Sequence, residues 1–189
     1  MLATAAVIAL VLVASITDLR RHRIYNWTTY PGILAALGLN TLGDAAVRFK
    51  VVAPQQCKWL GWIGLWPSLS GLLLCGGILL VCFVLFKVGG GDVKLIAMVG
   101  AFLGPQRGIE AMLWTFVIGA CLALIVLVWR VGPLRLGQHA FRYALWALRL
   151  GRPDPLEPEL RAQMQPPLFL APSALAAVVI VQFSLVEFL

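Results

Sequence analysis

Long apolar stretches with few charges constrain this chain more than any other feature. Hydrophobic residues make up 61% of its 189 residues, and charged residues make up 12%. A soluble domain carries roughly twice that fraction of charged residues. In a bilayer the backbone must satisfy its own hydrogen bonds, which favours helices. We therefore predict an all-α, polytopic membrane protein.

We predict six transmembrane helices in one domain over residues 1–189. A bilayer core about 30 Å thick is crossed by roughly 20 helical residues. The expected spans are Leu2–Thr17, Trp27–Gly43, Leu60–Phe86, Val93–Leu103, Ile109–Trp129 and Leu168–Phe188. The first is expected to continue past Asp18, and Gly104–Gly108 is expected to form an outer turn.

Basic residues indicate the orientation. The net charge is +7, which the positive-inside rule explains without a nucleic-acid partner. The residues expected in the cytoplasm are Arg20, Arg21, Arg23, Lys87, Lys94, Arg130, Arg135, Arg142, Arg149, Arg152 and Arg161. The remaining basic residues, Arg48, Lys50, Lys58 and Arg107, are expected outside, as are both termini.

Residues 131–166 are predicted to form a cytoplasmic amphipathic segment followed by a linker. Arg135, Arg142 and Arg149 recur every seven residues, so a helix would place them on one face. This pattern is typical of a basic helix on an anionic membrane surface, although a solvated helix packed on the bundle is the alternative. Gly151–Gln165 is rich in proline and is interpreted as the linker.

The four cysteines do not indicate a metal site or a disulfide framework. They are Cys57, Cys75, Cys82 and Cys121, and no two have C-x-x-C spacing. Three of them lie in apolar segments, where cysteine behaves as a small core residue.

Two aspartates are the candidate catalytic residues. Asp18 closes the first expected span and Asp92 opens the fourth, so both should lie on the cytoplasmic face. A carboxylate in hydrocarbon is disfavoured by roughly 3 kcal/mol, which makes such residues functional candidates. Two aspartates brought close share a proton, as aspartic proteolysis requires. The alternative is that each aspartate pairs with a nearby Arg or Lys.

Gly89, Gly90 and Gly91 precede Asp92 directly. Because glycine has no Cβ, another backbone can approach closely at these positions. The alternative is a tight turn in which the aspartate caps the next helix.

These motifs together resemble those of a known family, the type IV prepilin peptidases, which are GxGD membrane aspartic proteases. Gly89–Leu95 resembles their G-x-G-D motif and its continuation. Asp18–Asn26 is similar to their first catalytic loop, except that Tyr25 stands where a proline is usual. Pro167–Pro172 resembles the entry to their last helix. The likeness extends from Leu2 to Val181.

The resemblance implies a prepilin leader peptidase, an aspartic endopeptidase at the cytoplasmic face of the bacterial inner membrane. Such enzymes cut basic leader peptides from type IV pilin-like precursors, and the implied catalytic pair is Asp18 and Asp92. The expected substrate-binding residues are Gly89, Gly90, Gly91, Lys94 and Asn26. The chain is similar to the short, peptidase-only form found with tight-adherence (Flp) pili. No metal or cofactor is implied, and anionic membrane lipid is expected to hold the basic leader.

Two other classes of function fit intramembrane acids. A small proton- or ion-coupled transporter would use Asp18 and Asp92 for coupling, but it should show internal repeats, which this sequence lacks. A non-catalytic scaffold of a secretion or pilus system would tolerate the loss of either aspartate.

Overall fold

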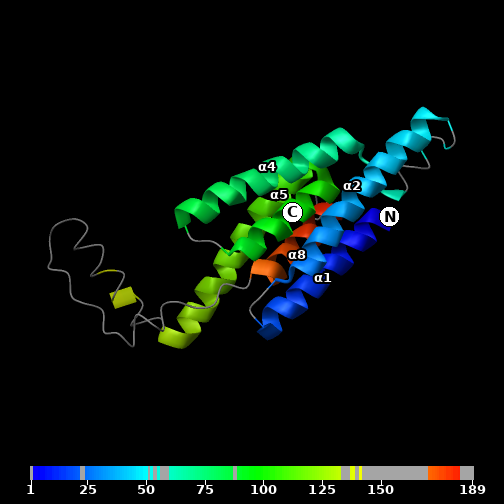
Figure 1. The fold of residues 1–189 in the computed structure, drawn as a ribbon. Coiled ribbons are helices and arrows are strands. Elements are labelled where there is room, and N and C mark those ends of the chain that lie inside the picture. Colours follow the sequence, from blue (N-terminus) through cyan, green and yellow to red (C-terminus); the bar gives the residue numbers. More distant parts are fainter. Residues whose placement is uncertain are drawn as a thin grey trace. The chain divides into compact units, whose positions relative to one another are not determined.

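The computed structural model describes residues 2–21, 24–50, 60–86, 89–132 and 170–183, together with residues 52, 55, 137, 138 and 141. Within these residues the chain forms helices and no strand, which confirms the predicted all-α fold. The helices are α1 (Leu2–Arg21), α2 (Asn26–Arg48), α4 (Leu65–Phe86), α5 (Gly90–Val131) and α8 (Leu170–Gln182), as Figure 1 shows. The amphipathic segment and linker expected over residues 131–166 lie almost wholly outside the described residues.

Three of the described helices are long and apolar enough to cross a membrane. The qualifying segments are Leu2–Arg21 of α1, Leu65–Leu85 of α4 and Gly90–Trp129 of α5. The α8 helix is also apolar but shorter. The expected total of six spans therefore stays a prediction.

The chain divides into two compact units. Residues 1–118 and 169–189 form the first, and residues 119–168 form the second. The described part of the second unit is mainly the end of α5. All the side chains discussed below as a site belong to the first unit.

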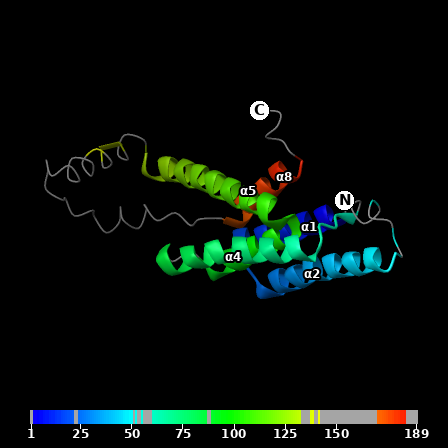
Figure 2. The same cartoon turned by 90° about the horizontal axis from the view of Figure 1, so that it is seen from above.

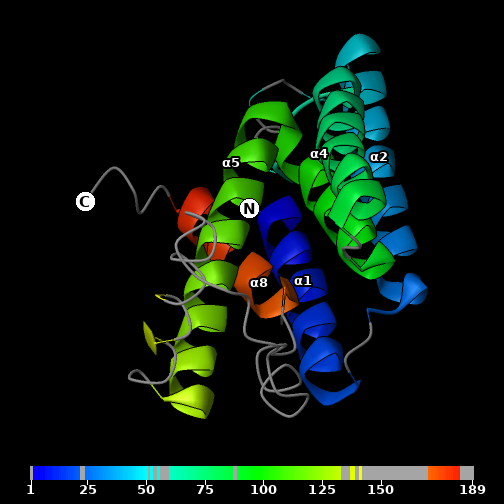
Figure 3. The same cartoon turned by 90° about the vertical axis from the view of Figure 1, so that its left-hand side faces the viewer.

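The α1 helix forms the centre of the first unit. It packs most extensively on α8 and also contacts α2, which in turn packs on α4. Figure 2 shows α1, α2 and α4 lying alongside one another, and Figure 3 shows α8 against α1. Buried residues of α1 recur every three or four positions, at Ala3, Val7, Val11 and Ala14. The buried residues of α8 are equally small: Ala171, Ala174, Ala177, Val178 and Val181. Small side chains on both helices allow them to pack closely.

The α5 helix is two helical segments that meet at Gly104. This residue has φ 80° and ψ −178°, a conformation that favours glycine, and Pro105 suits the first turn of the next segment. A Cβ on Gly108 would lie 3.0 Å from the Cα of Gly100. In one straight helix the two residues would be about 12 Å apart. The chain therefore folds back at Gly104. A turn was expected over residues 104–108, but within α5 only Gly104 leaves helical geometry.

The segment between α2 and α4 differs from the prediction. The α2 helix continues to Arg48 instead of ending near Gly43, and α4 begins at Leu65 instead of near Leu60. Asp44 explains both boundaries, because its carboxylate accepts hydrogen bonds from Trp62 Nε1 (2.8 Å) and from the backbone N–H of Leu65 (2.9 Å). Asp44, which follows the expected end of the second span at Gly43, is thus a helical residue that caps the start of α4.

Candidate active site

Asp18 lies near the C-terminal end of α1 and is only 8% exposed. Its Oδ2 accepts a hydrogen bond from the backbone N–H of Ala171 at 3.4 Å. Ala171 is the second residue of α8, whose first N–H groups have no partner within the helix. The packing of α8 on α1 thus places the N-terminus of α8 next to the buried Asp18 carboxylate. The partial positive charge of a helix N-terminus stabilises the negative charge of such a carboxylate.

Ser15, one turn before Asp18 on α1, also forms a hydrogen bond with Ala171 of α8. Its Oγ lies 2.9 Å from the Ala171 carbonyl oxygen and 2.8 Å from that of Val11, so it shares its proton between two acceptors. Ser15 is 4% exposed and Ala171 is fully buried. Because residues three apart share a helix face, Ser15 and Asp18 engage the two polar groups of one alanine. We did not predict a role for Ser15 from the sequence. A lone hydroxyl in an apolar span, three residues before the aspartate, was the available signal.

Asp92 lies in the first turn of α5, immediately after the glycines. The Gly89 carbonyl oxygen accepts the Asp92 N–H at 3.0 Å, and Asp92 is the acidic residue of the first turn of α5. An acidic residue there interacts favourably with the helix N-terminus, which agrees with the alternative interpretation in which the aspartate caps the helix. A Cβ on Gly89 would lie 2.8 Å from Asp92 Oδ2, closer than real side chains come. Glycine at position 89 therefore makes room for the carboxylate.

The fold brings Asp18 and Asp92 together. The two carboxyl groups lie near enough for Asp18 to act on Asp92 electrostatically. Each of them lies at the N-terminus of a helix, Asp18 bonded to the Ala171 N–H of α8 and Asp92 in the first turn of α5. These two helix ends offset part of the repulsion between like charges. Two neighbouring carboxyl groups are the arrangement that general acid and base catalysis by a carboxyl pair uses.

Comparison with known proteins gives one match. The model of the type IV leader peptidase family matches residues 5–124, which cover Asp18, the glycines and Asp92. The chain belongs to the type IV leader peptidase family. No curated protein and no solved structure matches it. Membership of this peptidase family, together with the long apolar helices, identifies an integral membrane peptidase. The α8 helix, which supplies the bond to Asp18, lies beyond the matched residues.

Tyr25 stands where a type IV leader peptidase usually has proline, and the backbone there is compatible with that residue. It is the N-cap of α2, with φ −82° and ψ 139°, close to the φ that proline imposes. Its hydroxyl accepts a hydrogen bond from Arg21 Nη1 at 3.0 Å. A side-chain contact thus links the end of α1 to the start of α2, and the backbone at Tyr25 itself has a φ that proline would also adopt.

Lys94 and Asn26, both expected to bind substrate, contact each other. Lys94 Nζ donates a hydrogen bond to Asn26 Oδ1 at 2.9 Å and lies 4.9 Å from the centre of the Tyr30 ring. Lys94 is half-buried and Asn26 is exposed. The lysine, two residues after Asp92 in α5, therefore joins α5 to α2.

The three glycines have different surroundings. Gly89 and Gly90 are exposed. A Cβ on Gly91 would lie 3.0 Å from the Cβ of Ile24, in the chain between α1 and α2. The close approach expected at Gly91 is thus made by this chain itself, while Gly89 and Gly90 face outward. Contact of any of the three with a substrate stays a prediction.

Proposed function

We propose that this protein is an aspartic endopeptidase that removes basic leader peptides from type IV pilin-like precursors. The observation that carries the proposal is the convergence of Asp18 and Asp92 at the N-termini of α8 and α5. Membership of the leader peptidase family supplies the substrate class.

The chemistry follows from one shared proton. The ionised aspartate takes a proton from water as the water oxygen attacks the scissile carbonyl carbon, and the protonated aspartate donates a hydrogen bond to the carbonyl oxygen. When the tetrahedral intermediate collapses, the C–N bond breaks and a carboxyl group passes a proton to the leaving amine. The two carboxyl groups end as they began, so no cofactor is consumed.

The substrate is proposed to lie along the exposed side of the site. Gly89 and Gly90 offer backbone without side chains, so an extended peptide can approach Asp92. Lys94, held by Asn26, has N–H donors for peptide carbonyl groups near the cleavage point. Gly91 packs on Ile24, and this contact is proposed to fix the position of the glycine segment beside Asp92.

We place the site at the cytoplasmic face of the bacterial inner membrane, in a six-span bundle. The basic residues near the site, including Arg20, Arg21 and Lys94, agree with the positive-inside rule. A basic leader is then attracted by anionic lipid around the enzyme and by the aspartate pair itself.

Asparagine substitutions test the aspartate pair. Asp18→Asn and Asp92→Asn keep the side-chain size and remove the acid, so each alone should abolish processing of a co-expressed precursor. The precursor would remain at its longer length on a gel, with the enzyme at wild-type level. The double variant should be no worse than either single one, because residues that act as a unit are not additive.

Glu110→Gln is the matched control, because it also replaces a carboxylate with an amide and its side chain is exposed on α5. Asp44 would be a poor control, since its carboxylate caps α4. Wild-type processing by either single asparagine variant would contradict the proposal and favour a transporter or a scaffold.

A further inference from the structure

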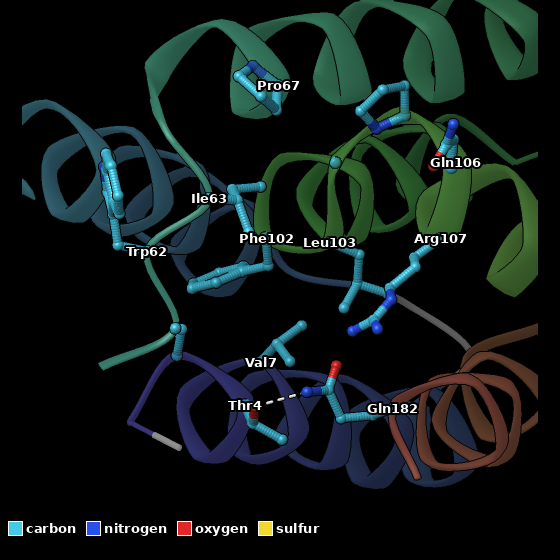
Figure 4. Close-up of a pocket in the computed structure, with 14 residues that line it drawn as sticks. Thr4, Val7, Trp62, Ile63, Pro67, Phe102, Leu103, Gln106, Arg107 and Gln182 are labelled. Atoms are coloured by element: carbon cyan, nitrogen blue, oxygen red, sulfur yellow. Dashed lines mark hydrogen bonds between the residues drawn. The ribbon is translucent and has the colours of Figure 1, made fainter. Parts of the chain in front are cut away.

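A cavity of about 740 Å³ lies in the first unit, at the end of α1 remote from Asp18 (Figure 4). Its apolar walls include Val7, Ile63, Phe102 and Leu103. These residues come from α1, from the chain before α4 and from α5, and the end of α8 closes another side. The cavity is separate from the aspartate pair, because Val7 lies about 16 Å from Asp18 along the axis of α1.

Arg107 puts a positive charge into this cavity. Figure 4 shows its side chain extending from α5 toward α1 and α8, where the guanidinium group lies between Val7 and Gln182. Among the described residues that line the cavity there is no Asp or Glu, and the Arg107 side chain forms no ion pair or hydrogen bond with any of the described residues. Gln182 Nε2 instead donates to Thr4 Oγ1 at 2.7 Å. Within the part of the chain that the structure describes, the cavity therefore presents a cation without an acidic partner beside apolar walls.

The position of the cavity along α1 suits a lipid headgroup. The 20 residues of α1 span about 30 Å, close to the thickness of the hydrocarbon core. Thr4 and Val7 lie within about 8 Å of its N-terminal end. With Asp18 at one membrane face, Arg107 is level with the headgroup region of the opposite leaflet. Phosphate is the abundant anion at that depth.

We propose that this cavity binds an acidic phospholipid. Its phosphate pairs with the Arg107 guanidinium, whose planar fork matches phosphate oxygens, and one acyl chain lies against Ile63, Pro67 and Leu103, apolar lining residues that are not fully buried. A phospholipid supplies both the anion and the hydrocarbon that the cavity can accept, whereas free phosphate supplies only the anion. A zwitterionic lipid fits less well, because its own ammonium group competes with Arg107 for the phosphate. The proposal does not depend on peptidase activity.

Thermal unfolding of the purified full-length protein in detergent tests the site. Phosphatidylglycerol at saturating concentration should raise the midpoint by about 3 °C or more, because a ligand that binds only the folded state stabilises it. Phosphatidylcholine with the same acyl chains, and inorganic phosphate alone, should give less than half that shift. Native mass spectrometry should show one phosphatidylglycerol retained per chain.

Arg107→Gln should lose the phosphatidylglycerol shift, and Arg107→Lys should keep part of it. Arg48→Gln is the matched control, since Arg48 is an exposed arginine at the end of α2 that does not line the cavity, and it should keep the whole shift. Leu103→Trp should reduce the shift by filling the path of the acyl chain. An equal shift with phosphatidylcholine, an equal shift with inorganic phosphate, or a shift retained in Arg107→Gln would each overturn the proposal.

Discussion

Ala171 is the residue through which α8 reaches the candidate site. Its N–H bonds to Asp18 and its carbonyl oxygen bonds to Ser15, so α1 fixes both polar groups of one buried residue. The Ser15 hydroxyl group therefore helps to fix the orientation of the Ala171 N–H that donates to the Asp18 carboxylate. We infer that Ser15 is a positioning residue for Asp18 if the aspartate pair is catalytic.

Ser15→Ala should lower kcat for leader removal by about 5-fold and leave KM nearly unchanged. The substitution removes one hydrogen bond, worth about 1 kcal/mol, from the support of Asp18 and touches no substrate group. Steady-state cleavage of a purified precursor gives both constants. Ser15→Thr, which keeps the hydroxyl group, should restore most of the loss.

Ser68→Ala is the matched control for Ser15→Ala. Ser68 is also a fully buried serine, and its Oγ donates to the Ala101 carbonyl oxygen at 2.7 Å between α4 and α5. Both alanine variants should lose similar stability on heating, but Ser68→Ala should keep kcat. Equal losses of kcat in the two variants would mean that Ser15 serves only stability.

At the scale of elements, glycines allow α4 to approach both segments of α5. A Cβ on Gly71 would collide with the Gly100 carbonyl oxygen and lie 2.7 Å from the carbonyl carbon of Gly104. Cys75, one turn along α4, is fully buried, and its Sγ lies 2.9 Å from where a Cβ on Gly100 or Gly108 would stand. The reversal at Gly104 is therefore packed directly against α4.

Gly71→Ala should destabilise the protein by about 1–3 kcal/mol, because the added methyl group meets backbone that cannot rotate away. Thermal unfolding in detergent measures this as a lower midpoint. Gly77→Ala on the same helix is the control, since nothing lies within 4 Å of its Cβ position, and alanine favours a helix over glycine. A midpoint unchanged in Gly71→Ala would show that α4 and α5 can separate slightly without loss.

Hydrophobic patterning predicted that these elements exist, but it could not predict where all of them end. The expected end of α2 at Gly43 relied on the polar residues that follow. The structure continues the helix because Asn40 and Asp44, one turn apart, bind the backbone before α4. Such side-chain bonds depend on a partner about 20 residues away, which periodicity does not reveal.

At the scale of the whole molecule, the proximity of Asp18 and Asp92 was expected because two predicted spans between them would return the chain to one face, and the electrostatic effect of Asp18 on Asp92 agrees with that proximity. The contact of α1 with α8 could not be predicted, because no sequence pattern connects residues 15 and 171, and only the packing of the two helices brings them together. Ser15 also bonds its own helix at Val11, so its local sequence context gives no sign of a distant partner. The resemblance at Pro167–Pro172 predicted the start of the last helix, but it did not predict the hydrogen bond between Ala171 and Asp18.

The proposed orientation predicts which residues an impermeant thiol reagent reaches in intact cells. In a variant without the native cysteines, Phe49→Cys should be labelled from outside, because Phe49 is 76% exposed at the expected outer end of α2. Gly90→Cys, exposed beside Asp92, should be labelled only after the membrane is opened. Labelling of Gly90→Cys in intact cells would contradict a cytoplasmic site.

If Asp18 and Asp92 are catalytic, the bond between Asp18 and Ala171 also affects when the site is completed during synthesis. The ribosome delivers α1 to the membrane first among the described helices and α8 last. Until α8 inserts, Asp18 lacks the helix end that stabilises it, although Asp92 is already in place. A nascent chain therefore carries both aspartates before it has a finished site. If the pair is catalytic, as we propose, its site is complete only once translation has passed α8.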